Sequence, residues 1–120
     1  MDDTGGLHES PIAGVEDRNG AVVVRLTGEL DLYNAQVVRD ELFAVAAHAP
    51  DRVVVELSAV TFIDSTGLGV LIEAQTQLAN RQAFLLAAPG LETRRALELS
   101  GLDRHFAVHE SLDEALAAKV

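Results

Sequence analysis

The sequence feature that most constrains the fold is a pair of apolar, valine-rich runs, Ala21–Leu26 and Arg52–Leu57, separated by a helix-length segment. Such continuous runs are typical of strands that are covered on both faces, as in parallel sheets. Between them, from about Tyr33 to Ala49, apolar residues recur at helical spacing until Pro50. The pattern predicts a strand–helix–strand unit with a right-handed crossover.

Shorter elements flank this unit. Ile12 to Val15 is a candidate first strand, and the Asn19-Gly20 pair favours a tight hairpin turn before Ala21. We further expect the second strand to stop before Thr27–Asp31 and a loop to cover Ser58–Asp64. After that loop the pattern predicts a helix over Thr66–Asn80, a strand over Gln82–Ala87 and a helix from Pro89 to Leu99. An edge strand over His105–Val108 and a last helix capped by Ser111 and Glu114 complete the expected order. With 120 residues the chain predicts one α/β domain over residues 12–120, preceded by a flexible tail over residues 1–11.

The composition limits the function. The chain has no cysteine, which excludes disulfides and thiolate metal sites, and its four histidines show no convincing metal spacing. Its formal net charge of −10 argues against binding to nucleic acid or to anionic membrane surfaces. No signal peptide and no apolar run long enough to span a bilayer is recognisable, so we expect a cytoplasmic protein.

The most unusual segment is Asp64-Ser65-Thr66-Gly67-Leu68-Gly69, where a loop is expected to meet a helix. Asp64 or Ser65 can accept hydrogen bonds from the first free amides of that helix. Gly67 and Gly69 each weaken a helix by roughly 0.5–1 kcal/mol relative to alanine. Two interpretations remain open: a capped helix whose glycines allow close packing, or a backbone that a partner approaches.

Topology suggests what surrounds this segment. Loops that follow two parallel neighbouring strands emerge at the same edge of a sheet, and sites in open α/β sheets form there. Asp31 and Ser65 are therefore expected on one rim. A phosphate on Ser65 would add about −1.5 to −2 charges at pH 7 beside Asp64 and Asp31, and would change the surface while the fold survives.

Enzymatic interpretations find little support. Asp64-Ser65-Thr66-Gly67 has one residue too many for the Asp-Ser/Thr-Gly of aspartic proteases, and Gly67-Leu68-Gly69 lacks the remainder of a nucleotide-binding motif. Catalysis by Ser65 would need a histidine base, and none is placed beside it by the sequence. We therefore expect a protein-binding module that needs no cofactor and no metal, and not an enzyme.

The chain resembles the STAS-domain anti-sigma factor antagonists, also called anti-anti-sigma factors, of bacteria. The resemblance rests on Leu26-Thr27-Gly28-Glu29-Leu30-Asp31, on Val54-Val55-Glu56-Leu57 followed by Phe62-Ile63-Asp64-Ser65-Thr66-Gly67-Leu68-Gly69-Val70, and on Leu99-Ser100-Gly101-Leu102. Together these segments cover roughly residues 12 to 117. The resemblance implies an α/β, STAS-like fold with a mixed, mostly parallel sheet of about five strands and about four helices.

The resemblance also implies a partner-switching cycle. Unphosphorylated members bind an anti-sigma factor and so free its sigma factor; the anti-sigma factor is a serine kinase that carries the ATP, and a phosphatase reverses the modification. The phosphorylated residue would be Ser65, with Thr66 as a secondary candidate. The partner-binding and switch residues would be Asp31, Asp64, Thr66, Gly67, Leu68, Gly69, Val70 and Glu73. The alternative is a STAS accessory subunit of a transport or signalling complex without phosphorylation.

Overall fold

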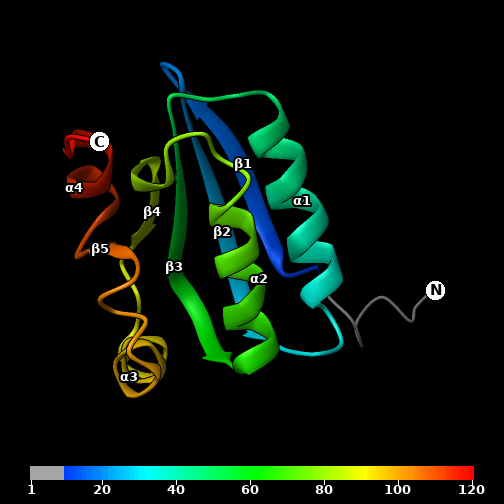
Figure 1. The fold of residues 1–120 in the computed structure, drawn as a ribbon. Coiled ribbons are helices and arrows are strands. Elements are labelled where there is room, and N and C mark those ends of the chain that lie inside the picture. Colours follow the sequence, from blue (N-terminus) through cyan, green and yellow to red (C-terminus); the bar gives the residue numbers. More distant parts are fainter. Residues whose placement is uncertain (1–9) are drawn as a thin grey trace.

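The computed structural model describes residues 10–120, in which a single five-stranded sheet has the order β1-β2-β3-β4-β5 (Figure 1). The outer pair β1/β2 is antiparallel, and the other three pairs are parallel. The elements are β1 (Ile12–Arg18), β2 (Ala21–Leu30), α1 (Ala35–Ala47), β3 (Arg52–Ile63), α2 (Ser65–Gln75), the short 3-10 helix η2 (Arg81–Ala83), β4 (Phe84–Ala87), α3 (Leu91–Ser100), β5 (Ala107–His109) and α4 (Leu112–Ala117). The α/β class and the mixed, mostly parallel sheet are as the resemblance implied.

The hairpin between β1 and β2 follows from its two turn residues. Asn19 and Gly20 have φ values of 55° and 94°, which is the left-handed region that a two-residue hairpin turn requires. Arg18 pairs with Ala21 directly across the turn. The predicted hairpin is confirmed, although β1 extends to Arg18 and not only to Val15.

Both central strands are longer than the sequence pattern indicated. β2 continues to Leu30 and β3 to Ile63, so the break expected at Thr27–Asp31 and the loop expected over Ser58–Asp64 are wrong. The two extensions pair with each other through irregular registers, and Gly28 supplies a positive φ of 77°. The extensions lose the apolar pattern because several of their side chains are exposed, whereas their backbones remain hydrogen-bonded in the ladder.

The sheet has two differently covered faces. Alternate valines separate them, since Val53 and Val55 belong to the larger core beneath α1 and α2, whereas Val54 belongs to a smaller core beneath α4. In Figure 1, α1 and α2 lie side by side over the β2/β3 region, and α3, β5 and α4 stand at the opposite side of the molecule. The larger core therefore holds the helix that begins at the candidate site.

The remaining boundaries differ from expectation in detail. α2 starts one residue early and ends at Gln75, not at Asn80, and the chain then turns into η2 before β4. Gly101 ends α3 in the left-handed conformation, with φ 78°, as a helix stop should. Ser111 caps α4 by accepting a hydrogen bond from the backbone N–H of Glu114 at 3.1 Å. The tail expected over residues 1–11 lies, up to residue 9, outside the described residues.

Candidate functional site

The candidate segment forms the junction between β3 and α2. Asp64 is the N-cap, and its Oδ1 accepts a hydrogen bond from the backbone N–H of Gly67 at 2.9 Å. Its carbonyl oxygen accepts from the N–H of Leu68, also at 2.9 Å. Ser65 is consequently the first residue of the helix, and it is exposed. The interpretation of this segment as a capped helix start is confirmed, with Asp64 as the cap.

The start of α2 is suited to an anionic group on Ser65. The first turn of a helix leaves backbone N–H groups without an acceptor inside the helix. Asp64 satisfies that of Gly67, and among residues 10–120 no side chain caps those of Ser65 or Thr66. The positive end of the helix dipole lies at the same place. A phosphate on Ser65 would thus meet unsatisfied donors without entering the core.

Asp31 stands at the same edge of the sheet. Leu30 pairs with Ile63, and Asp31 and Asp64 directly follow these two residues. The carbonyl oxygen of Leu30 accepts from the N–H of Asp64 at 3.1 Å, which ties the two strand ends together. In Figure 1 the end of β3, the start of α2 and the connection from β2 to α1 all lie at the lower end of the molecule.

The side chain of Asp31 also shapes its own loop. Its Oδ1 accepts from the backbone N–H groups of Tyr33 at 3.0 Å and Asn34 at 3.3 Å. Asn34 returns the contact, because its Oδ1 accepts from the N–H of Asp31 at 2.9 Å. This reciprocal turn leads into α1. Asp31 is therefore held by its own loop, and its charge lies on the rim that carries Ser65.

The two glycines of α2 have different reasons to be glycine. A Cβ on Gly67 would come within 2.9 Å of Ile63 Cγ1 and 3.0 Å of the Leu30 carbonyl oxygen. A Cβ on Gly69 would meet nothing within 4 Å. Close packing within the chain therefore explains Gly67, whereas the molecule itself gives no steric reason for Gly69. The alternative, that a partner approaches the backbone closely, therefore remains as an explanation of the glycine at position 69 only.

The remaining predicted residues divide into buried and accessible ones. Gly67, Leu68 and Val70 are buried against the core, so their side chains are not surface groups. Ser65 and Glu73 are exposed, and Thr66 and Gly69 are half-buried, all on the outer side of α2. A carboxylate oxygen of Glu73 lies 3.6 Å from Arg39 Nε, which connects the outer side of α2 to α1.

The sequence did not indicate that large apolar side chains would be exposed at this edge of the sheet. Leu32 and Tyr33, in the connection from β2 to α1, are 68% and 86% exposed, and Phe62, near the end of β3, is 48% exposed. Large exposed side chains of this kind are common at protein interfaces. The signal available in the sequence was the aromatic content: Tyr33 is the only tyrosine of the chain, and it lies at the expected start of the helix after the second strand.

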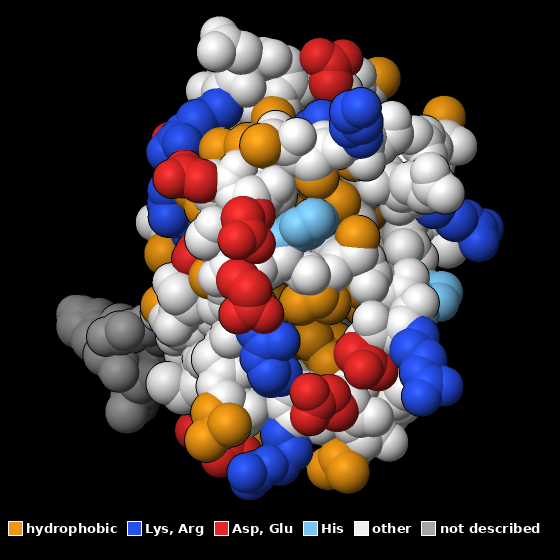
Figure 2. All heavy atoms as spheres, turned by 90° about the vertical axis from the view of Figure 1, so that its left-hand side faces the viewer, with side chains coloured by type: hydrophobic (Ala, Val, Ile, Leu, Met, Phe, Trp, Pro, Cys, Tyr) orange, Lys and Arg blue, Asp and Glu red, His pale blue; other side chains and the backbone are white. Residues whose placement is uncertain are grey.

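Other kinds of site find no support in residues 10–120. No group of three or more metal-ligating side chains is present there, and no helix in this part of the chain has the length and apolar character to cross a bilayer. His48 follows the end of α1 and His105 precedes β5, so neither stands at the β3–α2 junction. The face that carries α3, β5 and α4 mixes acidic and basic side chains around an apolar hollow (Figure 2). That face therefore has no continuous basic area of the kind that binds nucleic acid.

Comparison with known proteins agrees with this fold. Residues 13–115 match the model of the STAS domain, so the chain belongs to the STAS-domain family. Within that family it is similar to the anti-sigma-F factor antagonist RsfB of Mycobacterium tuberculosis, with 36% identity over 85% of this chain and 84% of that protein. It is also 31% identical to the anti-sigma-B factor antagonist of Bacillus subtilis, over 73% of this chain and 81% of that protein.

A solved structure gives the same result. The crystal structure of an anti-sigma factor antagonist from Mycobacterium paratuberculosis superposes with a TM-score of 0.80 and 39% identity, and the match covers 85% of this chain and 87% of that one. The chain is thus a member of the anti-sigma factor antagonists, which are regulators and not enzymes. This confirms the resemblance found in the sequence.

Proposed function

We propose that the protein binds an anti-sigma factor through the rim around Ser65, and that phosphorylation of Ser65 ends this binding. The observation that carries the proposal is the exposed hydroxyl of Ser65 at the first position of α2, directly after the Asp64 cap. The anti-sigma factor is in this proposal a serine kinase that brings its own ATP. A phosphatase restores the binding form, and the cycle runs in the cytoplasm.

The binding surface consists of groups that are accessible at the rim. It includes Ser65, Thr66 and Gly69 on α2 together with the exposed apolar side chains of Tyr33 and Phe62. The two aromatic residues supply the apolar contact area that interfaces use at their centres. Gly69 leaves space above the helix into which a partner side chain can fit. Leu68 and Val70 contribute indirectly, by holding α2 on the core.

The proposed switch depends on charge and not on unfolding. Phosphate would add about −1.5 to −2 charges at pH 7, next to the carboxylate of Asp64 and on the same rim as that of Asp31. The free N–H groups and the dipole of α2 stabilise such an anion locally. The domain therefore keeps its fold, whereas a partner would have to desolvate the new charge. A loss of about 4 kcal/mol would weaken binding roughly a thousandfold.

The deciding experiment is phosphorylation by the cognate anti-sigma factor with ATP, followed by mass spectrometry of the peptides. We expect a single phosphate on Ser65, no modification of the Ser65→Ala variant, and normal modification of Thr66→Ala. A phosphate at another residue would move the switch away from the β3–α2 junction. Binding without any phosphorylation would leave an interaction module without the switch, as in the accessory-subunit alternative.

A further inference from the structure

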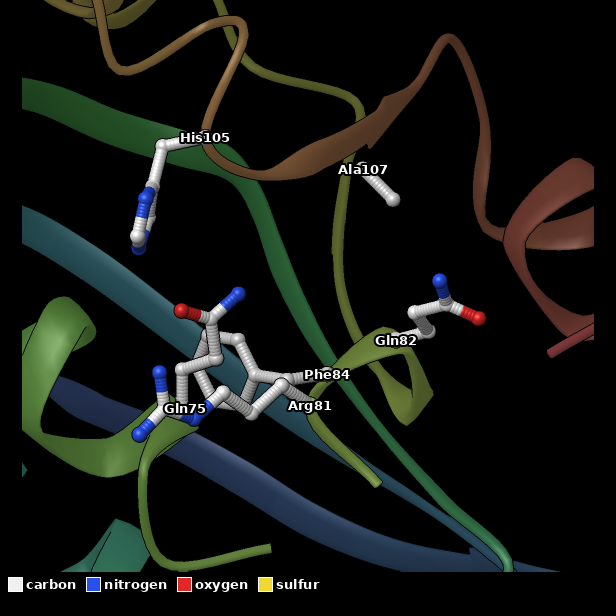
Figure 3. Close-up of a pocket in the computed structure, with 6 residues that line it drawn as sticks. All are labelled: Gln75, Arg81, Gln82, Phe84, His105 and Ala107. Atoms are coloured by element: carbon white, nitrogen blue, oxygen red, sulfur yellow. The ribbon is translucent and has the colours of Figure 1, made fainter.

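The last helix, α4, is too short to be stable by itself. It spans Leu112–Ala117, six residues, whereas an isolated helix of fewer than about 12–15 residues is marginal in water. Its neighbour β5 has three residues and lies at the edge of the sheet. β5 also borders an open hollow, which is lined by Ala107 together with Gln75 of α2 and Phe84 of β4 (Figure 3). α4 therefore depends on contacts with distant parts of the chain.

α4 covers the smaller of the two cores with little apolar area. It contributes Ala115, which is fully buried, and Leu112 and Leu116, which are only partly buried. Beneath them lie side chains of three neighbouring strands that are at most 1% exposed: Val23, Val54, Leu85 and Ala87. One small side chain and parts of two leucines thus keep an apolar strip of the sheet out of water. Because stabilisation by burial scales with apolar area, these contacts hold α4 only weakly.

Arg52 holds the end of α4 from a distant part of the chain. It is the first residue of β3, and its Nη1 donates hydrogen bonds to the carbonyl oxygens of Ala115 at 2.9 Å and Ala118 at 2.6 Å. The last carbonyl groups of a helix have no donor within the helix. A guanidinium group satisfies them and offsets the negative end of the helix dipole. Arg52 is therefore a C-terminal cap that lies 63 positions before the first carbonyl it binds.

The start of α4 is closed by local contacts instead. Ser111 Oγ accepts a hydrogen bond from the N–H of Glu114 at 3.1 Å, and Glu114 Oε1 accepts one from the N–H of Glu110, also at 3.1 Å. Both bonds join residues at most four positions apart, so they can persist when the helix leaves the sheet. The bonds from Arg52 form only while α4 is docked. Arg52 therefore stabilises the docked form specifically.

We propose that α4 detaches from the sheet as a unit while the remainder of the domain stays folded, and that Arg52 sets the population of the detached form. Detachment breaks only the contacts of α4 and the bonds from Arg52, whereas unfolding of the domain also opens the larger core. Elements with few buried apolar contacts open at a lower free energy than the whole domain. The detached form exposes the apolar strip beneath Ala115. This opening does not depend on the function proposed for the rim around Ser65.

Thiol labelling measures this opening, because the chain has no cysteine of its own. Val54→Cys and Val55→Cys place one thiol on either face of β3, at two positions that are both 0% exposed. Position 54 belongs to the small core beneath α4, and position 55 belongs to the larger core. With a chromogenic aromatic disulfide under native conditions, position 54 should react at least about tenfold faster than position 55. Equal rates would mean that both thiols become accessible only when the whole domain unfolds, and would overturn the proposal.

The role of Arg52 is tested in the Val54→Cys protein. Arg52→Gln removes both bonds from the guanidinium group to the end of α4, so it should raise the labelling rate at position 54 at least about tenfold. Arg104→Gln is the matched control, because it removes the same charge from an exposed position between α3 and β5, and it should leave the rate unchanged. An unchanged rate in Arg52→Gln would overturn the role assigned to Arg52.

A weakened larger core distinguishes detachment of α4 from unfolding of the whole domain. Val38→Ala shortens a buried side chain of α1 and destabilises the docked and the detached form equally, relative to the unfolded chain. It should therefore raise the labelling rate at position 55 at least about tenfold and leave the rate at position 54 unchanged. A parallel rise at both positions would overturn the proposal, because position 54 would then be reached only through global unfolding. Circular dichroism verifies that each variant is folded.

Discussion

The position of a Cβ on Gly67 lies 3.0 Å from the carbonyl oxygen of Leu30, so the first turn of α2 rests directly on the end of β2. The same oxygen accepts the hydrogen bond from the N–H of Asp64. The start of α2 is thus fixed by backbone contacts to the neighbouring strand. Ser65, which precedes Gly67 by two residues, owes its position to this contact and not to its own side chain.

The two glycines of α2 should respond in opposite ways to alanine. In Gly67→Ala the new methyl group would be 2.9 Å from Ile63 Cγ1 as well as close to Leu30, so we expect a loss of about 1–3 kcal/mol in the free energy of unfolding. In Gly69→Ala the methyl group meets nothing within 4 Å, and the better helix propensity should add roughly 0.5–1 kcal/mol. Urea denaturation measures both, and each variant is the control of the other. Equal effects of the two substitutions would contradict this account of the junction.

Asp64 should be a cap whose charge can be removed without much loss of stability. Asp64→Ala removes the acceptor for the N–H of Gly67 and should lower the free energy of unfolding by about 0.5–2 kcal/mol. Asp64→Asn keeps an oxygen acceptor at the same place and should stay close to the unmodified protein. Thermal or urea unfolding of the pair separates the two contributions. A similar loss in both variants would mean that the negative charge, and not the hydrogen bond, stabilises the helix start.

The sequence predicted the architecture better than the limits of its elements. The β2–α1–β3 unit and the Asn19-Gly20 hairpin were predictable, because each depends on a local pattern that the packing obeys. The extension of β3 to Ile63 was not, because the exposed polar residues Ser58 and Thr61 interrupt the apolar pattern while the backbone stays paired with β2. A pairing with a distant strand leaves no local trace in the sequence.

The candidate site also combines features that local sequence patterns predict with features that depend on distant residues. Local helix rules predicted a capped helix start but left Asp64 and Ser65 as alternatives for the cap and placed the first helical residue near Thr66. The structure makes Asp64 the cap and Ser65 the first residue. Which glycine packs inside and which faces outward depends on Leu30, which is 37 positions before Gly67 in the printed sequence. The exposure of Tyr33 at this edge depends on how the loop after β2 turns. Such facts require the assembled molecule.

Thr93 is an unusual group in the core and should tolerate loss of its hydroxyl. It is fully buried in α3, and its Oγ1 has no hydrogen-bond partner in the described part of the molecule. Thr93→Val replaces an unsatisfied hydroxyl with a methyl group, and we expect an unchanged or up to about 1 kcal/mol higher free energy of unfolding. Thr93→Ser keeps the hydroxyl and loses a packed methyl group, which should cost about 1 kcal/mol. Marked destabilisation of Thr93→Val would reveal a partner for the hydroxyl, such as a bound water.

The ion pairs of Glu16 at the β1/β2 edge should make the free energy of unfolding depend on pH in the acidic range. Hydrogen bonds from Arg25, at 2.8 Å, and Arg18, at 3.0 Å, lower the pKa of Glu16 below its ordinary value of 4.5. A carboxyl with a lower pKa in the folded state stabilises the fold above the pKa of the unfolded state, and this contribution disappears as pH falls through the folded-state pKa. Glu16→Gln should therefore reduce the fall in stability below pH 4.5.

The acid effect should be small and sensitive to salt, because the side chain of Glu16 is 40% exposed. Urea unfolding at several pH values, in low and high salt, measures it. Asp113→Gln, at the exposed first turn of α4, changes the charge equally without removing a pair seen in the structure and should leave the pH dependence nearer to that of the unmodified protein. An unchanged pH dependence in Glu16→Gln at low salt would show that these pairs contribute nothing.

The switch itself is tested by adding a permanent charge at Ser65. Ser65→Asp should weaken binding to the anti-sigma factor at least about tenfold, because a partner must desolvate a charge on the rim next to Asp64. Ser65→Ala should bind normally, since the exposed hydroxyl makes no hydrogen bond to the remainder of residues 10–120. Gln77→Asp adds the same charge at an exposed position beyond the other end of α2, and it should leave the affinity unchanged. Isothermal titration calorimetry gives the three affinities, and circular dichroism verifies that each variant is folded. Equal affinity of Ser65→Asp and the unmodified protein would mean that charge at the N-terminus of α2 does not control binding of the anti-sigma factor.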